Sequence, residues 1–550
     1  MNLLKERSYW WWKAAPKPWH PWALALATAG LGWAGWHPSP LTFLIFIMWV
    51  PLLWAAEMVM AQPERYRKPG RNFWAMAYTA LLFWNLATTW WIYNSTFAGA
   101  AGAIILNAGL MSIPWLVYVP VRQRFGVVQA LVALMLAWLT FEYIHLRWDL
   151  TWPWLTLGNA FAQRPDWVQW YEWTGALGGS AWVWWLNGAM FLGLASTQSK
   201  SLAKAVCWST AICLLFITTS YCIMPWRLLP PEGEAEVVVV QPNIDPYTEK
   251  FPGTERFIPY AQQLDRAWQL SQPLLDANTR WLLWPETTID GAMDEQGINT
   301  ESVIRGLRER LAPYPNLSLV VGATTVQFYK DSEAPGGARH DERLGHHNVF
   351  NTALHLRADS GVVGIYHKSK LVPGVEGMPY PALLGPLTAL VIDLGGTAGG
   401  LGRQMNRSVF KLPKEPGPLF AAIAPAVCYE SIFGDFMADF VREGAGFIGI
   451  ITNDAWWGNT PGHVQHFHMA RLRAIETRRW VARAANTGIS GYIDPLGQVI
   501  EQTEYGVQAA RKHTIALSTR RTWYVQTGDW FAMLLALFMG IWFWKSHPRR

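Results

Sequence analysis

Stretches of apolar residues long enough to cross a lipid bilayer alternate with short polar segments over the first 224 residues of the chain. A helix that spans the hydrocarbon core needs about 20 apolar residues. Seven stretches near this length come first, and a shorter one lies near the C-terminus. They are Trp19–Trp36, Leu41–Met60, Phe73–Tyr93, Phe97–Val121, Val127–Tyr143, Gly178–Leu194, Ala205–Met224 and Trp530–Trp544. The pattern predicts a polytopic α-helical membrane bundle with eight transmembrane helices.

The region between the seventh and eighth stretches has a different pattern, because short apolar runs typical of buried strands alternate there with helical stretches. The predicted strands are Val237–Gln241, Trp281–Glu286, Leu317–Thr324, Ile423–Glu430 and Phe447–Asp454. The predicted helices are Glu255–Leu275, Glu301–Leu311, Ser431–Arg442 and Gln465–Ala485. Such alternation indicates a layered α/β domain. The segment Asp331–His347, rich in glycine and charge, is predicted to be a surface loop.

The composition supports this division into a membrane part and a soluble part. Of the 550 residues, 51% are apolar and only 15% are charged, whereas about 25% are charged in an ordinary soluble domain. The chain has 36 tryptophans, and tryptophan favours the boundary between membrane and water. Mean hydropathy is only +0.08, so the apolar residues are concentrated in part of the chain. We expect a membrane domain over residues 1–229, an α/β domain over 230–528, and the eighth helix with its tail over 529–550.

Lysine and arginine gather in alternate loops, and loops rich in these residues stay in the cytoplasm. The rich set holds Lys5, Arg7, Lys13, Lys17, Arg65, Arg67, Lys68, Arg71, Arg122, Arg124, Lys200, Lys204, Lys545, Arg549 and Arg550. The opposite set holds Arg147, Arg164, Arg227, Arg520 and Arg521. Both termini are therefore predicted to be cytoplasmic, and residues 230–528 to lie on the outer face. A cleaved signal segment at the N-terminus is the alternative, but seven further spans and the lack of a convincing cleavage site favour retention.

A tryptophan-rich stretch between the fifth and sixth spans is too broken by prolines to cross a bilayer. It contains Trp148, Trp152, Trp154, Trp167, Trp170 and Trp173, with Pro153 and Pro165 among them. One interpretation is an aromatic belt at the membrane surface. The other is a partly buried hairpin that shapes a lipid-binding cleft under the outer domain.

Composition and spacing argue against several other classes of function. The net charge is +6, but the cations form no basic stripe with interleaved aromatic residues, so nucleic-acid binding is not expected. Three of the four cysteines share one apolar stretch, which argues against a disulfide framework. His463, His466 and His468 could be read as metal ligands, but the last two would diverge on a helix and no acidic or cysteine partner lies at ligand spacing. No metal is expected.

Three reactive residues follow apolar runs that are predicted to be strands of the α/β domain. Glu286 ends WLLWPE, Lys368 ends VVGIYHK, and Cys428 lies near the end of IAPAVCYE, just before a helical stretch. Sites in layered α/β folds gather at the carboxyl ends of strands. A thiol at a helix N-terminus beside an ammonium favours the thiolate. Cys428 is thus a candidate nucleophile, Glu286 a general base and Lys368 an oxyanion stabiliser, although each taken alone is an ordinary core or surface residue.

The local motifs are more specific than the spacing. WPET around Glu286, YHKSKLVPGVE over Tyr366–Glu376 and VCYES around Cys428 resemble the Glu-Lys-Cys triad of the nitrilase superfamily. Three further runs restrict the resemblance to one family within this superfamily: TNDAWWG, QHFHMARLRAIET and ANTGISGYIDPLGQV. With eight spans and an outer insert before the last, the chain as a whole resembles the bacterial apolipoprotein N-acyltransferases.

This resemblance implies an extracytoplasmic nitrilase-like domain, an α-β-β-α sandwich, on a multi-pass protein of the bacterial inner membrane. It implies that Glu286 is the base, Lys368 the transition-state stabiliser and Cys428 the nucleophile, with no cofactor. Supporting roles are implied for Glu376, Asn351, Tyr429 and Glu430. Two departures concern the loop Pro373–Gly377, whose sequence differs from the usual run, and Phe251, which stands where many members have tryptophan.

The reaction that the resemblance implies is a two-step acyl transfer through Cys428. A phospholipid, phosphatidylethanolamine in the first instance, would acylate the thiol, and the α-amine of a diacylglyceryl-cysteine apolipoprotein would then accept the acyl chain. The alternative enzyme is a membrane-anchored nitrilase-type amidase or hydrolase that uses water as acceptor. A non-catalytic lipoprotein-binding or transport protein that retains the fold is the alternative from another class, and the intact Glu286, Lys368 and Cys428 argue against it.

Overall fold

The chain divides into two compact units in the computed structural model, which describes residues 19–195, 199–227, 231–335, 338–385, 400–412 and 422–546. The helical unit comprises Met1–Trp90, Ala100–Pro225 and Thr527–Arg550. The α/β unit comprises Trp91–Gly99 and Trp226–Gln526. Of the cations used to predict orientation, Lys5, Arg7, Lys13, Lys17, Arg549 and Arg550 lie outside the described residues.

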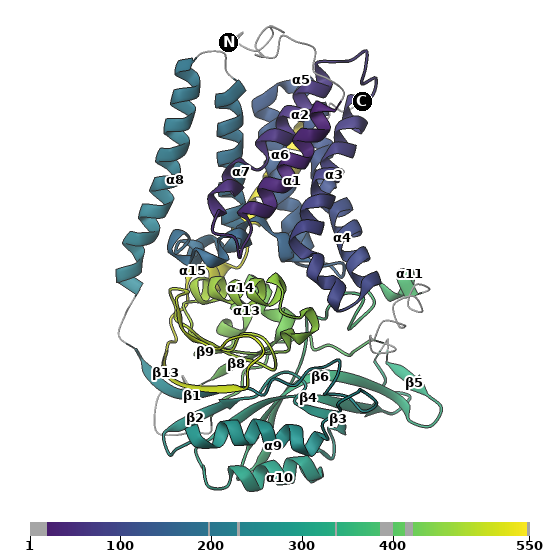
Figure 1. The fold of residues 1–550 in the computed structure, drawn as a ribbon, viewed down its shortest axis with the longest axis vertical. Coiled ribbons are helices and arrows are strands. Elements are labelled where there is room, and N and C mark those ends of the chain that lie inside the picture. Colours follow the sequence, from purple (N-terminus) through teal and green to yellow (C-terminus); the bar gives the residue numbers. More distant parts are fainter. Residues whose placement is uncertain are drawn as a thin grey trace. The chain divides into compact units, whose positions relative to one another are not determined.

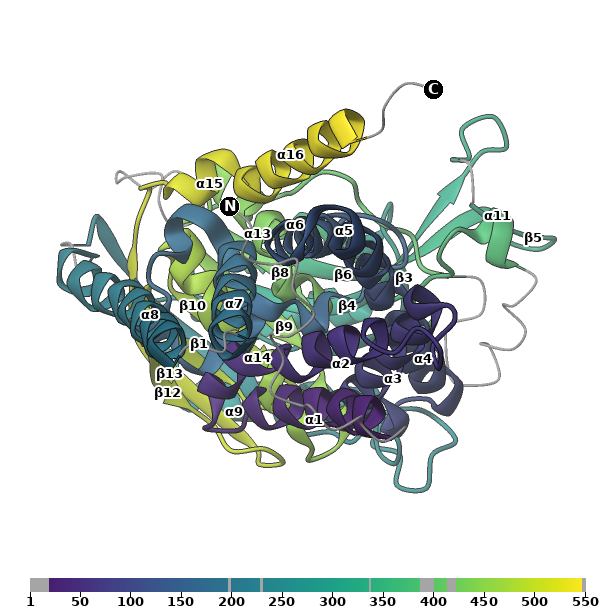
Figure 2. The ribbon, with the colours of Figure 1, turned by 90° about the horizontal axis from the view of Figure 1, so that it is seen from above.

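The helical unit is built from apolar helices that pack side by side (Figures 1 and 2). Its helices are α1 (His20–Gly35), α2 (Val50–Met60), α3 (Pro69–Thr89), α4 (Phe97–Ser112), α5 (Tyr118–Phe125), α6 (Val127–His145), α7 (Tyr171–Ala195), α8 (Ser199–Arg227) and α16 (Trp530–Ser546). The C-terminal helix α16 packs against α6 and α7, and Figure 2 shows its course past α6. Helix α7 breaks its helical geometry at Gly175, whose φ is +63°.

Four helical segments of the described chain are long and apolar enough to cross a membrane: Thr42–Met60, Gly99–Phe125, Val127–His145 and Val206–Met224. The segment Trp530–Gly540 is apolar but shorter. Each of these five falls on a stretch that the sequence predicts to be a span. The apolar character of the helical part is therefore observed, while the number of eight spans stays a prediction.

The core of the helical unit is a cluster of tryptophans. The ring of Trp49 lies 5.2 Å from those of Trp115 and Trp138, 5.5 Å from that of Trp184 and 5.7 Å from that of Trp84. All five side chains are buried. Aromatic pairs at these separations gain about 0.5–1.5 kcal/mol beyond the burial of their area. These tryptophans thus form the core of the helical unit. The composition predicts tryptophan at the boundary between membrane and water, and it does not predict this role.

The tryptophan-rich stretch forms three short 3-10 helices, Pro153–Leu155, Leu157–Gln163 and Pro165–Trp167. Trp154 is fully buried, whereas Trp173 is 39% exposed. Gly158 lets this stretch approach α7 closely, because a β-carbon there would lie 1.8 Å from the carbonyl oxygen of Ala176. Burial on this scale favours the interpretation of a packed hairpin over a belt confined to the surface.

The α/β unit contains two sheets. The eight-stranded sheet has the order β13-β1-β2-β4-β6-β5, with β3 paired to β4 and β7 to β6. Its strands are β1 (Gly233–Gln241), β2 (Thr279–Leu283), β3 (Ile289–Asp294), β4 (Ser318–Tyr329), β5 (Arg339–Asp341), β6 (Gly345–Arg357), β7 (Gly361–His367) and β13 (Ala509–Leu517). Strands β1, β2 and β4 are parallel, and β13 pairs antiparallel to β1.

The second sheet has five strands in the order β12-β11-β10-β9-β8. They are β8 (Ile423–Val427), β9 (Phe447–Thr452), β10 (Val481–Ala485), β11 (Gly491–Ile493) and β12 (Val499–Gln502). The three strands β8, β9 and β10 are parallel. The two sheets face each other, since Trp281 on β2 contacts Phe447 on β9 at 6.0 Å.

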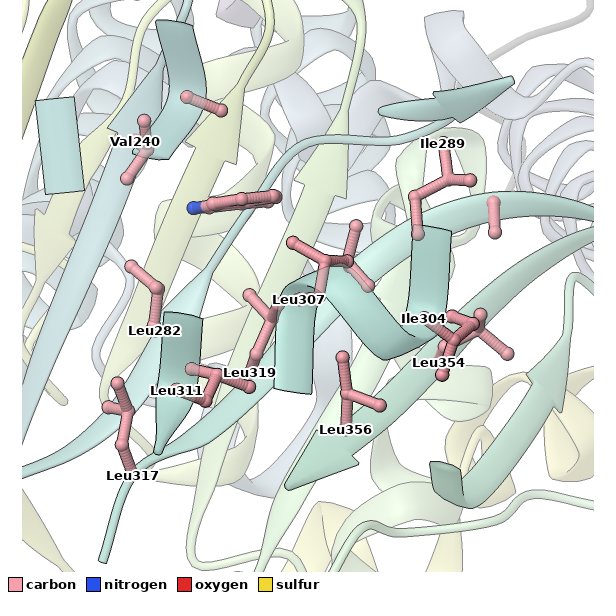
Figure 3. Close-up of a cluster of buried hydrophobic side chains, with 14 of the residues drawn as sticks. Val240, Leu282, Ile289, Ile304, Leu307, Leu311, Leu317, Leu319, Leu354 and Leu356 are labelled. Atoms are coloured by element: carbon pink, nitrogen blue, oxygen red, sulfur yellow. The ribbon is translucent and has the colours of Figure 1, made fainter. Parts of the chain in front are cut away.

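Helices cover the outer face of each sheet and complete an α-β-β-α arrangement (Figure 1). Helices α9 (Tyr260–Ser271) and α10 (Ser302–Leu311) cover the larger sheet, while α13 (Gly434–Arg442) and α14 (Pro461–Thr477) pack on the smaller one. Figure 3 shows Leu307 and Leu311 of α10 against Leu319 and Leu356 of the sheet. Two further short helices are α11 (Pro381–Leu384) and α15 (Trp523–Thr527).

Replacing Leu319 by alanine should destabilise the protein by about 2–5 kcal/mol, because a fully buried leucine leaves a cavity between β4 and α10. Thermal denaturation of the purified full-length protein in detergent checks this prediction. Leu344→Ala is the matched control, since Leu344 is 57% exposed and its removal should cost less than about 0.5 kcal/mol. Equal denaturation midpoints for the two variants would contradict this account of the core.

Three of the predicted elements are wrong in extent. The predicted helix Gln465–Ala485 ends at Thr477, because Arg478 adopts a left-handed conformation with φ +51°, and Val481–Ala485 forms β10. The predicted loop Asp331–His347 contains β5 and the start of β6. The strand that should end at Glu286 ends at Leu283, which leaves Glu286 in a loop.

Candidate active site

The residues that the sequence singles out follow strand ends of both sheets. Glu286 lies in the loop after β2, Lys368 directly after β7 and Cys428 directly after β8. Asn351 lies within β6, beside Lys368, whose backbone N–H donates to the carbonyl oxygen of Asn351 at 2.8 Å. All four side chains are buried. Strands from two facing sheets thus deliver the candidate residues to one place.

Lys368 lies between two carboxylates. Its Nζ is 2.7 Å from Oε1 of Glu376 and 3.1 Å from Oε1 of Glu286, and its side chain is 1% exposed. Burial lowers the pKa of Lys368, but Glu286 and Glu376 outweigh burial and hold this pKa well above its ordinary value. The lysine is therefore a permanently charged ammonium, which suits it to stabilise negative charge and not to act as a base.

The carboxylate of Glu286 accepts hydrogen bonds on both oxygens. Asn351 Nδ2 donates to Oε1 at 2.7 Å, and the backbone N–H of Asn453 donates to Oε2 at 3.1 Å. With Lys368 this makes three N–H donors on one side chain. Donors on both oxygens fix the orientation of this carboxylate.

A glycine on β4 makes room for the Glu286 loop. The N–H of Gly322 donates to the carbonyl oxygen of Pro285 at 3.1 Å. A β-carbon at position 322 would lie 2.5 Å from Cα of Glu286 and 2.5 Å from the backbone nitrogen of Thr287. The loop can approach the sheet this closely only because residue 322 has no side chain.

The loop Pro373–Gly377, whose sequence departs from the usual run, forms a tight turn that presents Glu376. Gly374 has a φ of +77° and donates its N–H to the carbonyl oxygen of Gly377 at 2.8 Å. The other oxygen of Glu376, Oε2, accepts from the backbone N–H of Val372 at 2.8 Å. Glu376 is thereby held against Lys368, and Asn351 Nδ2 lies 3.3 Å from its Oε1.

Cys428 occupies a sharp turn between β8 and the 3-10 helix Cys428–Ile432, with a φ of +50°. A non-glycine residue in the left-handed region costs about 1–3 kcal/mol and is typical of functional turns. Burial and the neighbouring Glu286 raise the pKa of the Cys428 thiol, although Lys368 acts in the opposite direction. Burial and Glu286 thus oppose the effect of Lys368, which favours the thiolate, and the raised pKa leaves the thiol in need of a base.

Glu430 holds the Cys428 turn and the Lys368 loop together. Its Oε1 accepts from the hydroxyl of Tyr366 at 2.7 Å and from the N–H of Ser369 at 2.6 Å, and its Oε2 accepts from the N–H of Val427 at 2.8 Å. Burial raises the pKa of Glu430. Tyr429 is buried on the other side of the turn, where its ring packs edge-to-face on Phe433 at 5.2 Å.

Two residues to which the sequence gives no role, Lys250 and Asn453, contact the Glu286 loop. Lys250 donates from Nζ to the carbonyl oxygen of Thr287 at 2.7 Å and to its hydroxyl at 2.6 Å. Burial lowers the pKa of Lys250 to about 8. The neighbouring Phe251 stacks on Trp456 at 6.4 Å. The sequence shows a lysine after the first strand and an asparagine in the TND run. It does not show which residues these two side chains contact.

The segment Trp91–Gly99, which links α3 to α4, belongs to the α/β unit. Asn94 donates from Nδ2 to the carbonyl oxygen of Trp457 at 2.7 Å and accepts, through its own carbonyl oxygen, from the hydroxyl of Tyr247 at 2.8 Å. The rings of Trp91 and Trp457 lie 4.9 Å apart. A loop between two apolar helices is therefore part of the structure around Trp456 and Trp457.

The three histidines of α14 have different neighbours. His463 packs on the ring of Tyr505 at 4.4 Å, and Nδ1 of His466 lies 3.0 Å from Asp454. Burial lowers the pKa of His468 to about 3. Among the residues that the structure describes, no group of three or more histidine, cysteine, aspartate or glutamate side chains is arranged to hold a metal ion.

Comparisons with known proteins match both parts of the chain. Residues 333–524 match the family described as carbon-nitrogen hydrolase, and residues 28–189 match the apolipoprotein N-acyltransferase N-terminal domain. The apolipoprotein N-acyltransferase of Chlorobaculum tepidum is 29% identical over 515 residues, which cover 91% of each chain. That of Allorhizobium ampelinum is 28% identical over 516 residues, 91% of this chain and 90% of the relative. Among solved structures, the nitrilase-superfamily protein Nit3 of Saccharomyces cerevisiae overlaps 52% of this chain and 91% of its own, with 12% identity and a TM-score of 0.35.

Proposed function

The chain belongs to the apolipoprotein N-acyltransferase family, and on that premise we propose how its residues transfer a fatty acyl chain from a phospholipid to the N-terminal amine of a lipoprotein. The protein is an acyltransferase with a phospholipid donor and a lipoprotein acceptor. The observation that carries the proposed mechanism is the contact of the buried Lys368 with the buried Glu286 and with the partly exposed Glu376, together with the burial of Cys428 at the end of β8. We propose Cys428 as the nucleophile, Glu286 as the base and Lys368 as the oxyanion stabiliser.

In the first half-reaction, the thiol proton of Cys428 passes to Glu286 as sulfur attacks the ester carbonyl carbon of the phospholipid. The carbonyl oxygen becomes an oxyanion, and the ammonium of Lys368 stabilises its charge. The ester C–O bond then breaks. Glu286 returns the proton to the departing oxygen, which leaves a lysophospholipid and a thioester on Cys428.

In the second half-reaction, the α-amine of the diacylglyceryl cysteine attacks the thioester carbon. Glu286 takes a proton from the amine, the C–S bond breaks, and the sulfur of Cys428 recovers a proton. The products are an amide and the free enzyme. Glu376 and Asn351 hold Lys368 and Glu286 through both steps, and Glu430 fixes the turn that carries Cys428.

The apolar helices give a physical reason for the architecture. Burying an acyl chain contributes roughly 0.8 kcal/mol per CH₂, so both lipid substrates stay in the bilayer and the enzyme must meet them there. We propose eight spans, with residues 1–229 as the membrane domain, 230–528 as a catalytic domain in the periplasm, and 529–550 as the last helix and a cytoplasmic tail. The location is the bacterial inner membrane, and the donor is phosphatidylethanolamine.

The test is transfer of a labelled acyl chain from phosphatidylethanolamine to a diacylglyceryl-cysteine lipopeptide by the purified full-length protein. Formation of labelled amide is expected. Release of free fatty acid without amide would support the membrane-anchored hydrolase instead, and amide formed only with another phospholipid class would correct the donor.

Gly322→Ala should reduce this transfer by about 100-fold, because a new methyl group would push the Glu286 loop off the sheet and misplace the base. Gly306→Ala on α10 is the matched control, since a β-carbon there meets no atom within 4 Å. The control should retain full activity and gain up to about 1 kcal/mol in stability from the better helix former. Transfer assays at saturating phospholipid measure the activity of both variants. Full activity of Gly322→Ala would mean that Glu286 does not need this loop position.

A further inference from the structure

A fully buried group of three charged or titratable side chains lies behind the Cys428 turn. Asp454 follows β9, His466 lies on α14 and Arg483 lies on β10. Asp454 Oδ2 is 2.6 Å from Arg483 Nη2, and Asp454 Oδ1 is 3.0 Å from His466 Nδ1. Each of the three side chains is 0% exposed. The acyl-transfer mechanism described above uses none of them.

Burying charges is expensive, since each ion loses several kcal/mol of hydration even after the surroundings relax. Here the cost is offset by close partners. Thr452 donates its hydroxyl to Asp454 Oδ1 at 3.0 Å, and Arg483 also donates from Nε to the carbonyl oxygen of Ile489 at 3.1 Å. A group that is this costly and this well paired holds its members in fixed positions.

The imidazole of His466 connects this group to the nucleophile. Its Nδ1 faces Asp454 and Arg483, with Arg483 Nη2 at 3.1 Å. Its Nε2 lies 3.2 Å from the carbonyl oxygen of Cys428. Nε2 also lies 3.0 Å from Oγ of Ser431. Burial and Arg483 lower the pKa of His466, although Asp454 acts in the opposite direction. A carbonyl oxygen only accepts hydrogen bonds, so the contact with Cys428 places a proton on Nε2.

The carbonyl oxygen of Cys428 accepts a second hydrogen bond, from the hydroxyl of Ser431 at 2.8 Å. Cys428 has the strained φ of +50°. The backbone conformation at Cys428 fixes the direction of its Cα–Cβ bond, from which the sulfur projects. Two donors on this carbonyl therefore stabilise this strained backbone conformation.

We propose that His466 is a positioning residue for the nucleophile, and that its Nε2–H holds the Cys428 carbonyl while Asp454 and Arg483 hold the ring. This inference rests on the proposed role of Cys428. It extends that role by three fully buried residues, from the turn after β9, from α14 and from β10. Loss of the Nε2 donor should slow acylation of the thiol without weakening phospholipid binding.

Two substitutions at His466 test the inference as a matched pair in the full-length protein. His466→Gln keeps an N–H donor near the position of Nε2, whereas His466→Asn keeps one only near Nδ1. The readouts are the single-turnover rate of acylation by labelled phospholipid, the apparent KM for that phospholipid, and the thermal denaturation midpoint. We expect His466→Asn to acylate about 100-fold more slowly with KM within about twofold, and His466→Gln to recover about tenfold of that loss.

Ser431→Ala provides a second test that leaves the buried charges intact. It removes the other donor to the Cys428 carbonyl, together with the 3.0 Å contact between Ser431 Oγ and His466 Nε2, and should slow acylation by about tenfold or less. Equal loss in His466→Gln and His466→Asn, together with lowered denaturation midpoints, would overturn the inference in favour of a purely structural role. So would a wild-type rate in both His466→Asn and Ser431→Ala. Failure of the wild-type protein to form any acyl-enzyme would instead overturn the proposed function.

Discussion

Replacing Cys428 by alanine should abolish amide formation to below about 0.1% of the wild-type rate, because the proposed mechanism carries the acyl chain from donor to acceptor on the sulfur of Cys428. The three remaining cysteines lie on α8, among apolar residues. Cys213→Ala is the matched control and should transfer at the wild-type rate. The measurement is amide yield from labelled phosphatidylethanolamine and a diacylglyceryl-cysteine lipopeptide.

The substitution itself should leave the fold intact. Cys428 is buried at a turn, and alanine removes only the sulfur while the carbonyl contacts of the turn remain. Thermal denaturation of the Cys428→Ala protein should therefore match the wild type within a few degrees. Amide formation by the alanine variant would show that the acyl chain reaches the acceptor directly, without a covalent enzyme intermediate.

Replacing Glu286 by glutamine should reduce the rate of acylation by about 10²–10⁴-fold, the range expected for loss of a general base. Burial and Glu286 keep the Cys428 thiol protonated by raising its pKa, so sulfur cannot attack unless a base removes the proton. Glutamine keeps the size of the side chain but accepts no proton. Glu309→Gln, on the exposed side of α10, is the control.

The rate to measure is the first turnover with labelled phospholipid and no acceptor. The Glu286→Gln protein should bind phospholipid with an unchanged apparent KM, because the carboxylate faces Lys368 and Asn351 at the site of chemistry. A loss that appears entirely in KM would assign Glu286 to substrate binding and would leave the proton on Cys428 without an acceptor.

The positions of the three central residues could be predicted because each follows a short apolar run that forms a strand. β8 and β9 begin where the sequence indicates, and the predicted helix Glu301–Leu311 corresponds to α10. Local pattern carries this information. It does not carry the contact of Lys368 with both Glu286 and Glu376, since Glu286 follows β2, Glu376 lies in the loop after β7, and the three side chains meet only in the folded chain.

Other features could not be predicted for the same reason. Val481–Ala485 is a short apolar run that periodicity cannot assign to helix or strand, and it becomes β10 by pairing with β9. The sequence places the Cys428 thiol beside a helix N-terminus and a lysine, which favour the thiolate, but it does not show the burial that raises the pKa of the thiol, because burial depends on the packing of both sheets. In the helical unit, tryptophans likewise pack into a core. Composition alone places these tryptophans at the membrane surface.

The most direct test of the account is the mass of the full-length protein after incubation with phosphatidylethanolamine in the absence of acceptor. The account predicts an increase by one acyl group, located on the peptide that contains Cys428, removed by hydroxylamine and lost when the diacylglyceryl-cysteine lipopeptide is added. An active preparation that carries no adduct, or carries it on another residue, would contradict the covalent relay through Cys428.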